Sequence, residues 1–226
     1  MSKAVIIYGP PGSGKGTQAD LLARKFNFIH LDTGRYLESL FRSPKAKTDP
    51  ILKREKANFD SGILCSPEWV LKITREESER IAKAGYNLVF SGSPRTMFEA
   101  FGGGKTKGLT ESLIKSFGKE NISVVLLNVE DSTSIKRNSH RVVCSQCGLP
   151  KLESAKLPHC ALCAGTMRTR SLDNPEVIKV RLKEYRERTY PIVSEMKKKG
   201  FTIKKLDGES LPYKVSEKII KALKLG

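Results

Sequence analysis

Residues 9–17 read Gly-Pro-Pro-Gly-Ser-Gly-Lys-Gly-Thr, and this segment indicates the fold of the chain more clearly than any other. It fits the G-x-x-x-x-G-K pattern of a phosphate-binding loop, although a glycine follows the lysine and the hydroxyl comes one place later. Glycines let the backbone curl so that its N–H groups point at phosphate oxygens, and the lysine adds a mobile positive charge. The alternative is a glycine-rich turn without a ligand. The residues expected to hold phosphate are Gly12, Ser13, Gly14, Lys15, Gly16 and Thr17.

Apolar runs alternate with helical segments outward from this loop. A buried strand is expected over 4–8 and a helix from Gly14 to about Phe26. Ser66 and Asn174 each precede a proline, which is a favourable start for a helix. Because strands that alternate with helices form a parallel sheet covered on both faces, the predicted fold class is α/β with a doubly wound parallel sheet. Further strands are expected over 28–31, 88–90, 124–129 and 201–206, a closing helix over 211–224, and a flexible connector over 102–108.

Composition and charge narrow the class of protein. The chain has 226 residues, of which 38% are hydrophobic and 29% charged, so a folded chain is expected rather than a disordered one. The net charge of +17 favours anionic ligands such as nucleotides, nucleic acid or acidic lipid, but a lysine-rich surface that merely faces water is the alternative. No apolar run approaches the roughly 20 residues of a membrane-spanning helix. The first residues run directly into the loop motif without the pattern of a signal peptide, so a cytoplasmic location is expected.

Four of the five cysteines form two C-x-x-C pairs separated by twelve residues. In a chain without a secretory signal, this spacing indicates a metal site rather than disulfides. Four thiolates complete a tetrahedron, so the predicted site is structural zinc with no open position for catalysis. The alternatives are unligated thiols or iron in place of zinc. The predicted ligands are Cys144, Cys147, Cys160 and Cys163, whereas Cys65 stands alone and the histidines His30 and His140 belong to no recognisable motif.

The loop sequence at 9–18 resembles that of adenylate kinases and related nucleoside monophosphate kinases. Four more blocks follow in that family's order, at 32–34, 62–68, 92–96 and 170–185. The cysteines fall where many bacterial and archaeal members carry a metal-binding lid. The resemblance therefore implies a phosphate-loop core with two insertions. The core would comprise 1–31, 67–140 and 172–226, the insert that binds the monophosphate 32–66, and the zinc-binding lid 141–171.

The activity that this resemblance implies is phosphoryl transfer from ATP–Mg²⁺ to a nucleoside monophosphate, with AMP giving two ADP. A monomer is expected, and nucleic acid and membrane are not expected as partners. Such transfer asks mainly for positioning and for positive donors around the phosphates, which guanidinium groups supply. By motif position, the implied catalytic residues are Lys15, Arg95, Arg141, Arg170 and Arg181. Arg137 would lie along the ATP base and Arg141 at the ATP phosphates. The acceptor nucleotide would contact Thr33, Cys65, Gly92, Arg95, Glu99, Arg170 and Arg181.

Several residues depart from the family pattern on the acceptor and magnesium side. Ser91 replaces the aspartate that orders the magnesium and its waters, and Ser93 replaces a phenylalanine. Glu38 stands where an arginine is expected, with Arg35 three residues earlier, so either the arginine compensates or the glutamate points away. Leu172 replaces the first aspartate of a pair in the last block.

Glu99 stands where the family reads adenine with a glutamine. A glutamine amide both donates and accepts, whereas a carboxylate only accepts, which suits guanine N1–H and N2–H better than adenine N1. A kinase acting on another monophosphate such as GMP is therefore one alternative. A basic, zinc-bearing nucleic-acid-binding protein with weak kinase activity is the other, although the sequence lacks a basic patch interleaved with aromatic residues.

Overall fold

A computed structural model of the chain describes residues 2–151 and 157–225. A five-stranded parallel sheet lies at its centre, in the strand order β10-β6-β1-β3-β2. The phosphate-loop strand is therefore central, with Ile6 in register with Phe90 on one side and Val124 on the other. This order confirms the predicted doubly wound α/β class. The strands are β1 (Ala4–Tyr8), β2 (Phe28–Leu31), β3 (Asn87–Phe90), β6 (Ile122–Asn128) and β10 (Ile203–Asp207).

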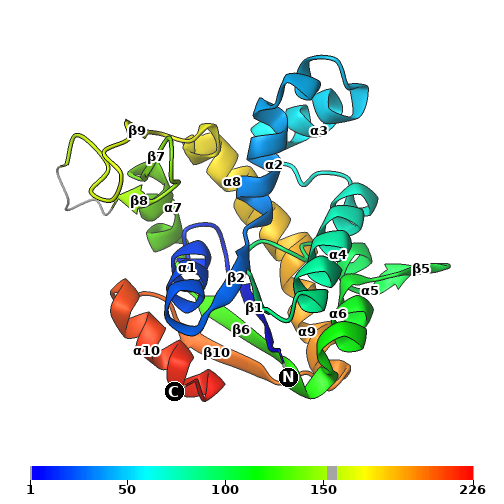
Figure 1. Cartoon of the computed structure of the whole chain (residues 1–226). Coiled ribbons are helices and arrows are strands. Elements are labelled where there is room, and N and C mark those ends of the chain that lie inside the picture. The colour runs from blue at the N-terminus through cyan, green and yellow to red at the C-terminus, as the bar shows by residue number, and fades with distance from the viewer. Residues whose placement is uncertain (1, 152–156, 226) are drawn as a thin grey trace.

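Helices cover both faces of this sheet (Figure 1). Alternate residues of β1 enter opposite apolar clusters, as the two-residue period of a strand requires. Ala4 and Ile6 join one cluster, and Val5 and Ile7 join the other. The first cluster is completed by α4 (Pro67–Lys83), α6 (Leu109–Phe117) and α9 (Tyr190–Lys198), and the second by α1 (Lys15–Phe26) and α10 (Pro212–Leu223).

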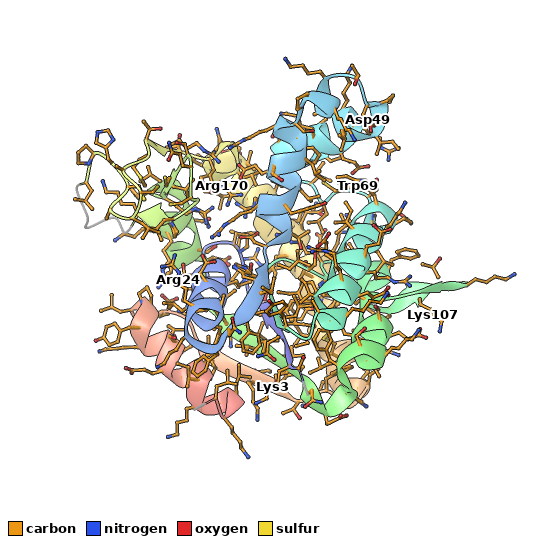
Figure 2. The ribbon with its side chains drawn as sticks, viewed as in Figure 1. Lys3, Arg24, Asp49, Trp69, Lys107 and Arg170 are labelled. Atoms are coloured by element: carbon orange, nitrogen blue, oxygen red, sulfur yellow. The ribbon has the colours of Figure 1, made fainter. Side chains whose placement is uncertain are left out.

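Two segments extend beyond the sheet layer (Figure 1). One consists of α2 (Thr33–Arg42), a 3₁₀ turn η1 (Pro44–Lys47) and α3 (Pro50–Ser61). It has its own apolar cluster, in which Trp69 stacks on Phe41 with ring centroids 6.1 Å apart (Figure 2). The other segment is a small antiparallel sheet of β7 (Val142–Cys144), β8 (Pro150–Lys151) and β9 (Met167–Arg168), which follows α7 (Asp131–Ser139). Residues 152–156 of the predicted lid lie outside the described residues, as do the terminal residues 1 and 226 of the predicted core.

A continuous helical segment returns from the small sheet to the core. It comprises α8 (Pro175–Glu184), a π-helical turn at Tyr185–Thr189 and α9, after the 3₁₀ turn η3 (Ser171–Asp173). Asn174 caps α8 as predicted, because its side chain accepts the N–H of Glu176. Within the residues that the structure describes, no helix is long and apolar enough to cross a bilayer.

The prediction of a flexible connector over 102–108 is wrong. After the short α5 (Met97–Phe101), this stretch forms an ordered hairpin of β4 (Gly102–Gly103) and β5 (Thr106–Lys107). Gly102 has φ +76°, and a Cβ there would lie 1.9 Å from the carbonyl oxygen of Thr106. The glycine therefore permits a close strand approach rather than flexibility. The last strand also begins at Ile203 rather than at 201, because the N–H of Phe201 bonds to Met196 at the end of α9.

Candidate active site

The loop between β1 and α1 curls as the glycines predict. Gly12 has φ +79°, and a Cβ there would lie 2.6 Å from the side-chain nitrogen of Asn138 on α7. Only glycine fits both this backbone conformation and this contact. The hydroxyl of Ser134, also on α7, donates to the carbonyl of Pro11, so α7 holds the loop from outside. Gly14 ends the loop in the left-handed conformation, and α1 begins at Lys15, so the amides of Lys15, Gly16 and Thr17 form the free N-terminal turn of a helix.

The Lys15 ammonium lies inside this loop. Its Nζ donates to the carbonyls of Gly9 at 2.7 Å and Pro10 at 2.8 Å, with the Ser13 hydroxyl at 3.5 Å. Burial lowers the pKa of Lys15 well below its usual value, and the positive charges of Arg95, Arg181 and Arg141 lower it further. Three of the predicted arginines therefore act electrostatically on the loop lysine, although they come from distant parts of the chain.

Hydrogen bonds to other parts of the chain fix two of these arginines, and the positive charges of the arginines act on one another. Arg141 makes a two-pronged contact with Asp173 at 2.9 and 2.5 Å, and Arg181 donates to the carbonyl of Leu172 at 3.0 Å. Burial lowers the pKa of Arg181 to about 9, and its neighbours Arg141 and Arg95 contribute to that shift. So much positive charge in one partly desolvated place favours a multiply charged anion.

Glu38 does not point away from the site. Its carboxylate lies 3.3 Å from Arg168 and 3.8 Å from Arg170, which belong to the predicted lid, and 3.4 Å from Arg42 of its own helix. Figure 2 shows Arg170 between the small sheet and α2. Arg35 does not take the place of the missing arginine either, since Asp20 holds it at 2.8 Å and Asp32 at 3.1 Å. Glu38 is therefore an ion-pair partner of two arginines of the predicted lid.

A cleft extends from the phosphate loop between α2 and the loop after β3. Thr33 and Gly92 line it, together with Ser93, Arg95 and Cys65. Among the described residues, the buried hydroxyls of Thr33 and Ser93 find no hydrogen-bond partner. Buried polar groups are normally satisfied, so these hydroxyls indicate where polar atoms of a ligand would lie. The same is true of the buried Nε–H of Arg170, for which the described part of the chain provides no acceptor.

The surroundings of residue 172 suit a leucine better than the aspartate that the family has there. The side chain is buried in the apolar cluster that includes Leu37, Phe41 and Phe59, and it also lines the cleft. A carboxylate in this position would lose hydration against these apolar side chains. Asp173, the remaining aspartate, is the residue that Arg141 and Arg181 share.

Glu99 lies at the inner end of the cleft and is only 2% exposed. One carboxyl oxygen accepts the backbone N–H of Arg95 at 2.8 Å, and the other lies 3.1 Å from the hydroxyl of Thr96. Burial raises the pKa of Glu99 to about 7 despite these hydrogen bonds. A neutral carboxyl group is consequently well populated near neutral pH, and it offers an O–H donor beside a carbonyl acceptor.

Cys65 lines the same cleft as Glu99. The thiol donates to the carbonyl of Glu55 at 3.5 Å, and burial raises the pKa of Cys65 to about 12. The fully buried Glu55 also accepts the N–H and the hydroxyl of Ser66, which fixes the chain between α3 and α4. Ser66 begins α4 as predicted, but its hydroxyl serves this bond and does not cap the helix.

Arg137 lies on the other side of the phosphate loop. Its guanidinium donates to the carbonyls of Gly208 and Glu209 at 2.9 Å and of Gly12 at 3.4 Å. It therefore bridges the loop and the turn after β10. This position agrees with the expected location beside the donor nucleotide, which stays a prediction.

One hydrogen-bonded group of side chains beside the cleft was not predicted from the sequence. His30 Nδ1 lies 2.7 Å from Asp20 Oδ1, and His30 Nε2 lies 2.7 Å from Ser91 Oγ. No motif identifies these three residues, which come from α1, from β2 and from the loop after β3. Only the pairing of β2 with β3 brings the histidine and the serine together.

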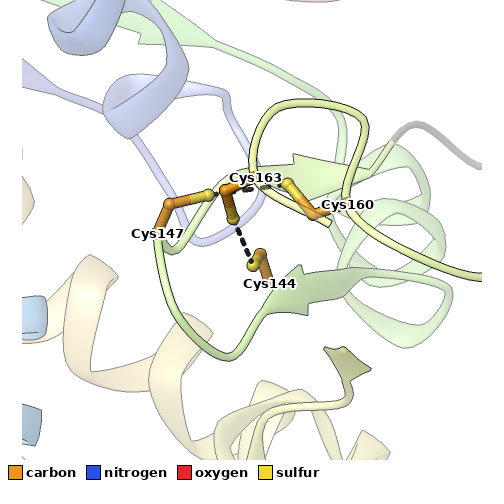
Figure 3. A group of neighbouring side chains, drawn as sticks. All are labelled: Cys144, Cys147, Cys160 and Cys163. Carbon is orange, nitrogen blue, oxygen red and sulfur yellow. Dashed lines mark hydrogen bonds between the residues drawn. The ribbon is translucent and has the colours of Figure 1, made fainter. Parts of the chain in front are cut away.

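The four predicted metal ligands gather beside the small sheet, with Cys144 at the end of β7 and the other three on the adjoining loops (Figure 3). Their sulfur atoms all lie within 4.8 Å of one another, with 3.5 Å between Cys144 and Cys163 and 3.6 Å between Cys147 and Cys160. Four sulfurs around one tetrahedral zinc, each about 2.3 Å from it, would be about 3.8 Å apart. A hydrogen bond from the backbone N–H of Cys147 helps to lower the pKa of Cys144 to about 6, and the backbone N–H of Leu162 helps to lower the pKa of Cys160. Both shifts favour the thiolate form, which is the form that binds metals.

Comparison with known proteins agrees with this geometry. Residues 7–201 match the family model for adenylate kinase. The chain belongs to the adenylate kinase family. An adenylate kinase of Petrotoga mobilis is 30% identical to it over 224 residues, which cover 97% of each chain. An adenylate kinase of Magnetococcus marinus is 33% identical over 218 residues, which cover 94% of this chain and 96% of the relative.

Adenylate kinases transfer a phosphoryl group between ATP and AMP and use Mg²⁺ with the ATP. The present chain is accordingly a phosphotransferase of the nucleoside monophosphate kinase type. This adenylate kinase family member combines the parallel sheet order with a lysine-bearing loop and with arginines that act electrostatically on that lysine.

Proposed function

We propose that this chain transfers the γ-phosphoryl group of ATP–Mg²⁺ to AMP and that the residues of the cleft divide the task as follows. The loop amides and Lys15 would hold the donor phosphates, and Arg137 would lie along the donor base. Arg141 would reach the donor phosphates, and Arg95 the acceptor phosphate. Arg170 and Arg181 would stabilise the charge on the transferred group. The observation that carries this proposal is the electrostatic action of Arg95, Arg141 and Arg181 on Lys15.

Two hydroxyls of the cleft, those of Thr33 and Ser93, have no hydrogen-bond partner among the described residues and support an acceptor phosphate beside them. A monophosphate has several acceptor oxygens, which such donors need. Gly92 would keep this space open, because a Cβ there would lie 3.2 Å from the Arg95 guanidinium. In-line transfer would require the acceptor oxygen to face the end of the polyphosphate held at Lys15.

We further propose that segment 32–66 acts as the acceptor insert and 141–171 as the lid on a core of 1–31, 67–140 and 172–226. The contacts of Glu38 with Arg168 and Arg170 support this proposal, because they join the two segments. A Cβ on Gly148, in the turn between β7 and β8, would also lie 3.6 Å from the side chain of Arg35 on α2. Closure of this kind excludes water and suppresses hydrolysis of ATP.

The oxygen-bearing residues beside the loop fit a hard cation that accompanies ATP. Thr17 lies in the first turn of α1, Asp32 acts electrostatically on Lys15, and Ser91 lines the same cleft. When bound, Mg²⁺ neutralises the phosphate charge that develops in transfer. The chain's own part would be to orient the phosphates through Lys15 and the loop amides and to hold the ion's waters through these oxygens.

We propose AMP as the acceptor rather than GMP because of the environment of Glu99. A neutral carboxyl group presents a donor and an acceptor side by side, as the family's glutamine amide does. It would donate to adenine N1 and accept from the amino group. The raised pKa of Glu99 supports this neutral form near pH 7.

A structural zinc ion in the lid is the metal that the four cysteines fit best. The sulfur distances suit tetrahedral thiolate coordination, and the lid strands are only two or three residues long. A segment with so little core of its own would depend on the ion for its fold. We further propose a monomer, and cysteines that bind a metal instead of forming disulfides favour a location in the cytoplasm.

A coupled assay of ADP formation tests the proposed function. Purified protein would receive ATP–Mg²⁺ with AMP, GMP, CMP or UMP near neutral pH. We expect AMP to be preferred, and the variant Glu99→Gln to keep that preference. A preference for GMP that Glu99→Gln converts to AMP would establish the alternative acceptor. Absence of transfer to any monophosphate would overturn the proposal.

A further inference from the structure

Asp20, His30 and Ser91 form a continuous hydrogen-bonded chain that ends in the cleft. The distances are 2.7 Å from Asp20 Oδ1 to His30 Nδ1 and 2.7 Å from His30 Nε2 to Ser91 Oγ. The His30 side chain is only 7% exposed. Ser91 lines the same cleft as Gly9 and Lys15 and is itself buried. Such a chain has a direction, because each hydrogen bond needs one donor and one acceptor.

The carboxylate fixes that direction. Burial acts to raise the pKa of Asp20, but hydrogen bonds from His30 and Arg35 outweigh it and hold that pKa below its usual value. An ionised carboxylate only accepts, so Nδ1 of His30 carries the proton. In the neutral imidazole, Nε2 then has no proton and must accept the hydroxyl hydrogen of Ser91. Both lone pairs of Ser91 Oγ remain for partners on the cleft side.

We propose that His30, anchored by Asp20, is a positioning residue that turns the Ser91 hydroxyl into an acceptor facing the phosphate loop, where it holds a water of the ATP-bound magnesium ion. The inference rests on the proposed function. It explains how a neutral serine serves where the family has an aspartate, because a hydroxyl with a fixed hydrogen presents only lone pairs to such a water. Without the imidazole, the hydroxyl hydrogen would rotate freely and would point at the metal-bound water part of the time.

The test measures metal binding rather than catalysis. Mn²⁺ serves as the probe, and its dissociation constant is measured by EPR on protein loaded with the β,γ-imido analogue of ATP. We expect Ser91→Ala and His30→Leu each to weaken Mn²⁺ binding about five-fold, the value of one ordinary hydrogen bond. The affinity for the analogue without metal should stay unchanged. The double variant should bind Mn²⁺ no more weakly than Ser91→Ala alone, because the histidine acts through the serine.

Two further variants separate positioning from structural damage. Adding Ser91→Asp to His30→Leu should restore Mn²⁺ affinity, since a carboxylate accepts in any orientation. Ser112→Ala is the matched control, because this buried hydroxyl bonds to Glu79 on the far side of the sheet. It should leave Mn²⁺ affinity unchanged.

Three results would overturn the inference. One is an unchanged Mn²⁺ affinity in His30→Leu, another an equal loss of analogue binding with and without metal. The third is transfer of a phosphoryl group from ATP to Ser91 Oγ, detected by mass spectrometry, which would make the serine a nucleophile that His30 deprotonates. If the wild-type protein failed to bind the analogue at all, the proposed function would fail, whereas normal binding with unaltered metal affinity removes this inference alone.

Discussion

Replacing Glu99 by glutamine should change how the stability of this protein depends on pH. The carboxyl group is buried, and its pKa rises from an ordinary 4.5 to about 7 on folding. The folded chain therefore binds this proton more tightly than the unfolded chain does. That contribution to stability is complete below about pH 4.5, declines as the pH rises, and is lost above about pH 7. At about 1.4 kcal/mol for each pH unit of that interval, the total is about 3 kcal/mol.

Glutamine keeps the size and the acceptor oxygen but does not ionise. Urea unfolding of the wild-type protein and of Glu99→Gln at about pH 5 and about pH 8 gives the free energy of unfolding at each end. The variant should gain up to about 3 kcal/mol relative to the wild type between these conditions, while all other groups titrate alike in both proteins. The Michaelis constant for AMP should rise with pH in the wild type and stay flat in Glu99→Gln. Parallel stability curves for the two proteins would refute a buried neutral carboxyl group.

Three other changes have outcomes that follow from particular contacts. Glu38→Gln should lower the Michaelis constant for AMP about five-fold with little change in kcat, because the carboxylate no longer competes with phosphate for Arg170. Steady-state kinetics measure both constants, and an unaltered Michaelis constant would contradict this competition. Leu172→Asp should lower the free energy of unfolding by about 3 kcal/mol in a urea titration, since the new carboxylate would replace an apolar side chain in the cluster of Leu37, Phe41 and Phe59, and a neutral effect would contradict that packing. Chelation should release about one zinc ion per chain and lower the melting temperature, as elemental analysis and calorimetry would measure; an iron content instead would correct the assigned metal.

Local signals in the sequence predicted much of the fold. Glycines flanked by an apolar run and a helical pattern predicted the loop around Lys15, because all its determinants lie within one strand, one turn and one helix. The spacing of Cys144 and Cys147, repeated at Cys160, predicted a cluster because each C-x-x-C turn brings its own two sulfurs together.

Contacts between residues that are far apart in the sequence could not be predicted from the sequence. His30 meets Ser91 across 61 residues of sequence, and Glu38 meets Arg168 across 130. The protonation of Glu99 depends on burial, which composition does not reveal. Glycine itself is ambiguous, since at Gly102 it permits a tight hairpin where the sequence equally suggests a flexible segment.

We propose that the loop amides and Lys15 hold a polyphosphate while arginines from three other segments close on its end. The decisive experiment is a crystal structure of the protein with the β,γ-imido analogue of ATP, Mg²⁺ and AMP. We expect the triphosphate inside loop 9–17 with Lys15 Nζ on its phosphates, and the monophosphate in contact with Arg95. A polyphosphate bound elsewhere, or a Lys15 side chain that still bonds only to the carbonyls of Gly9 and Pro10, would contradict it.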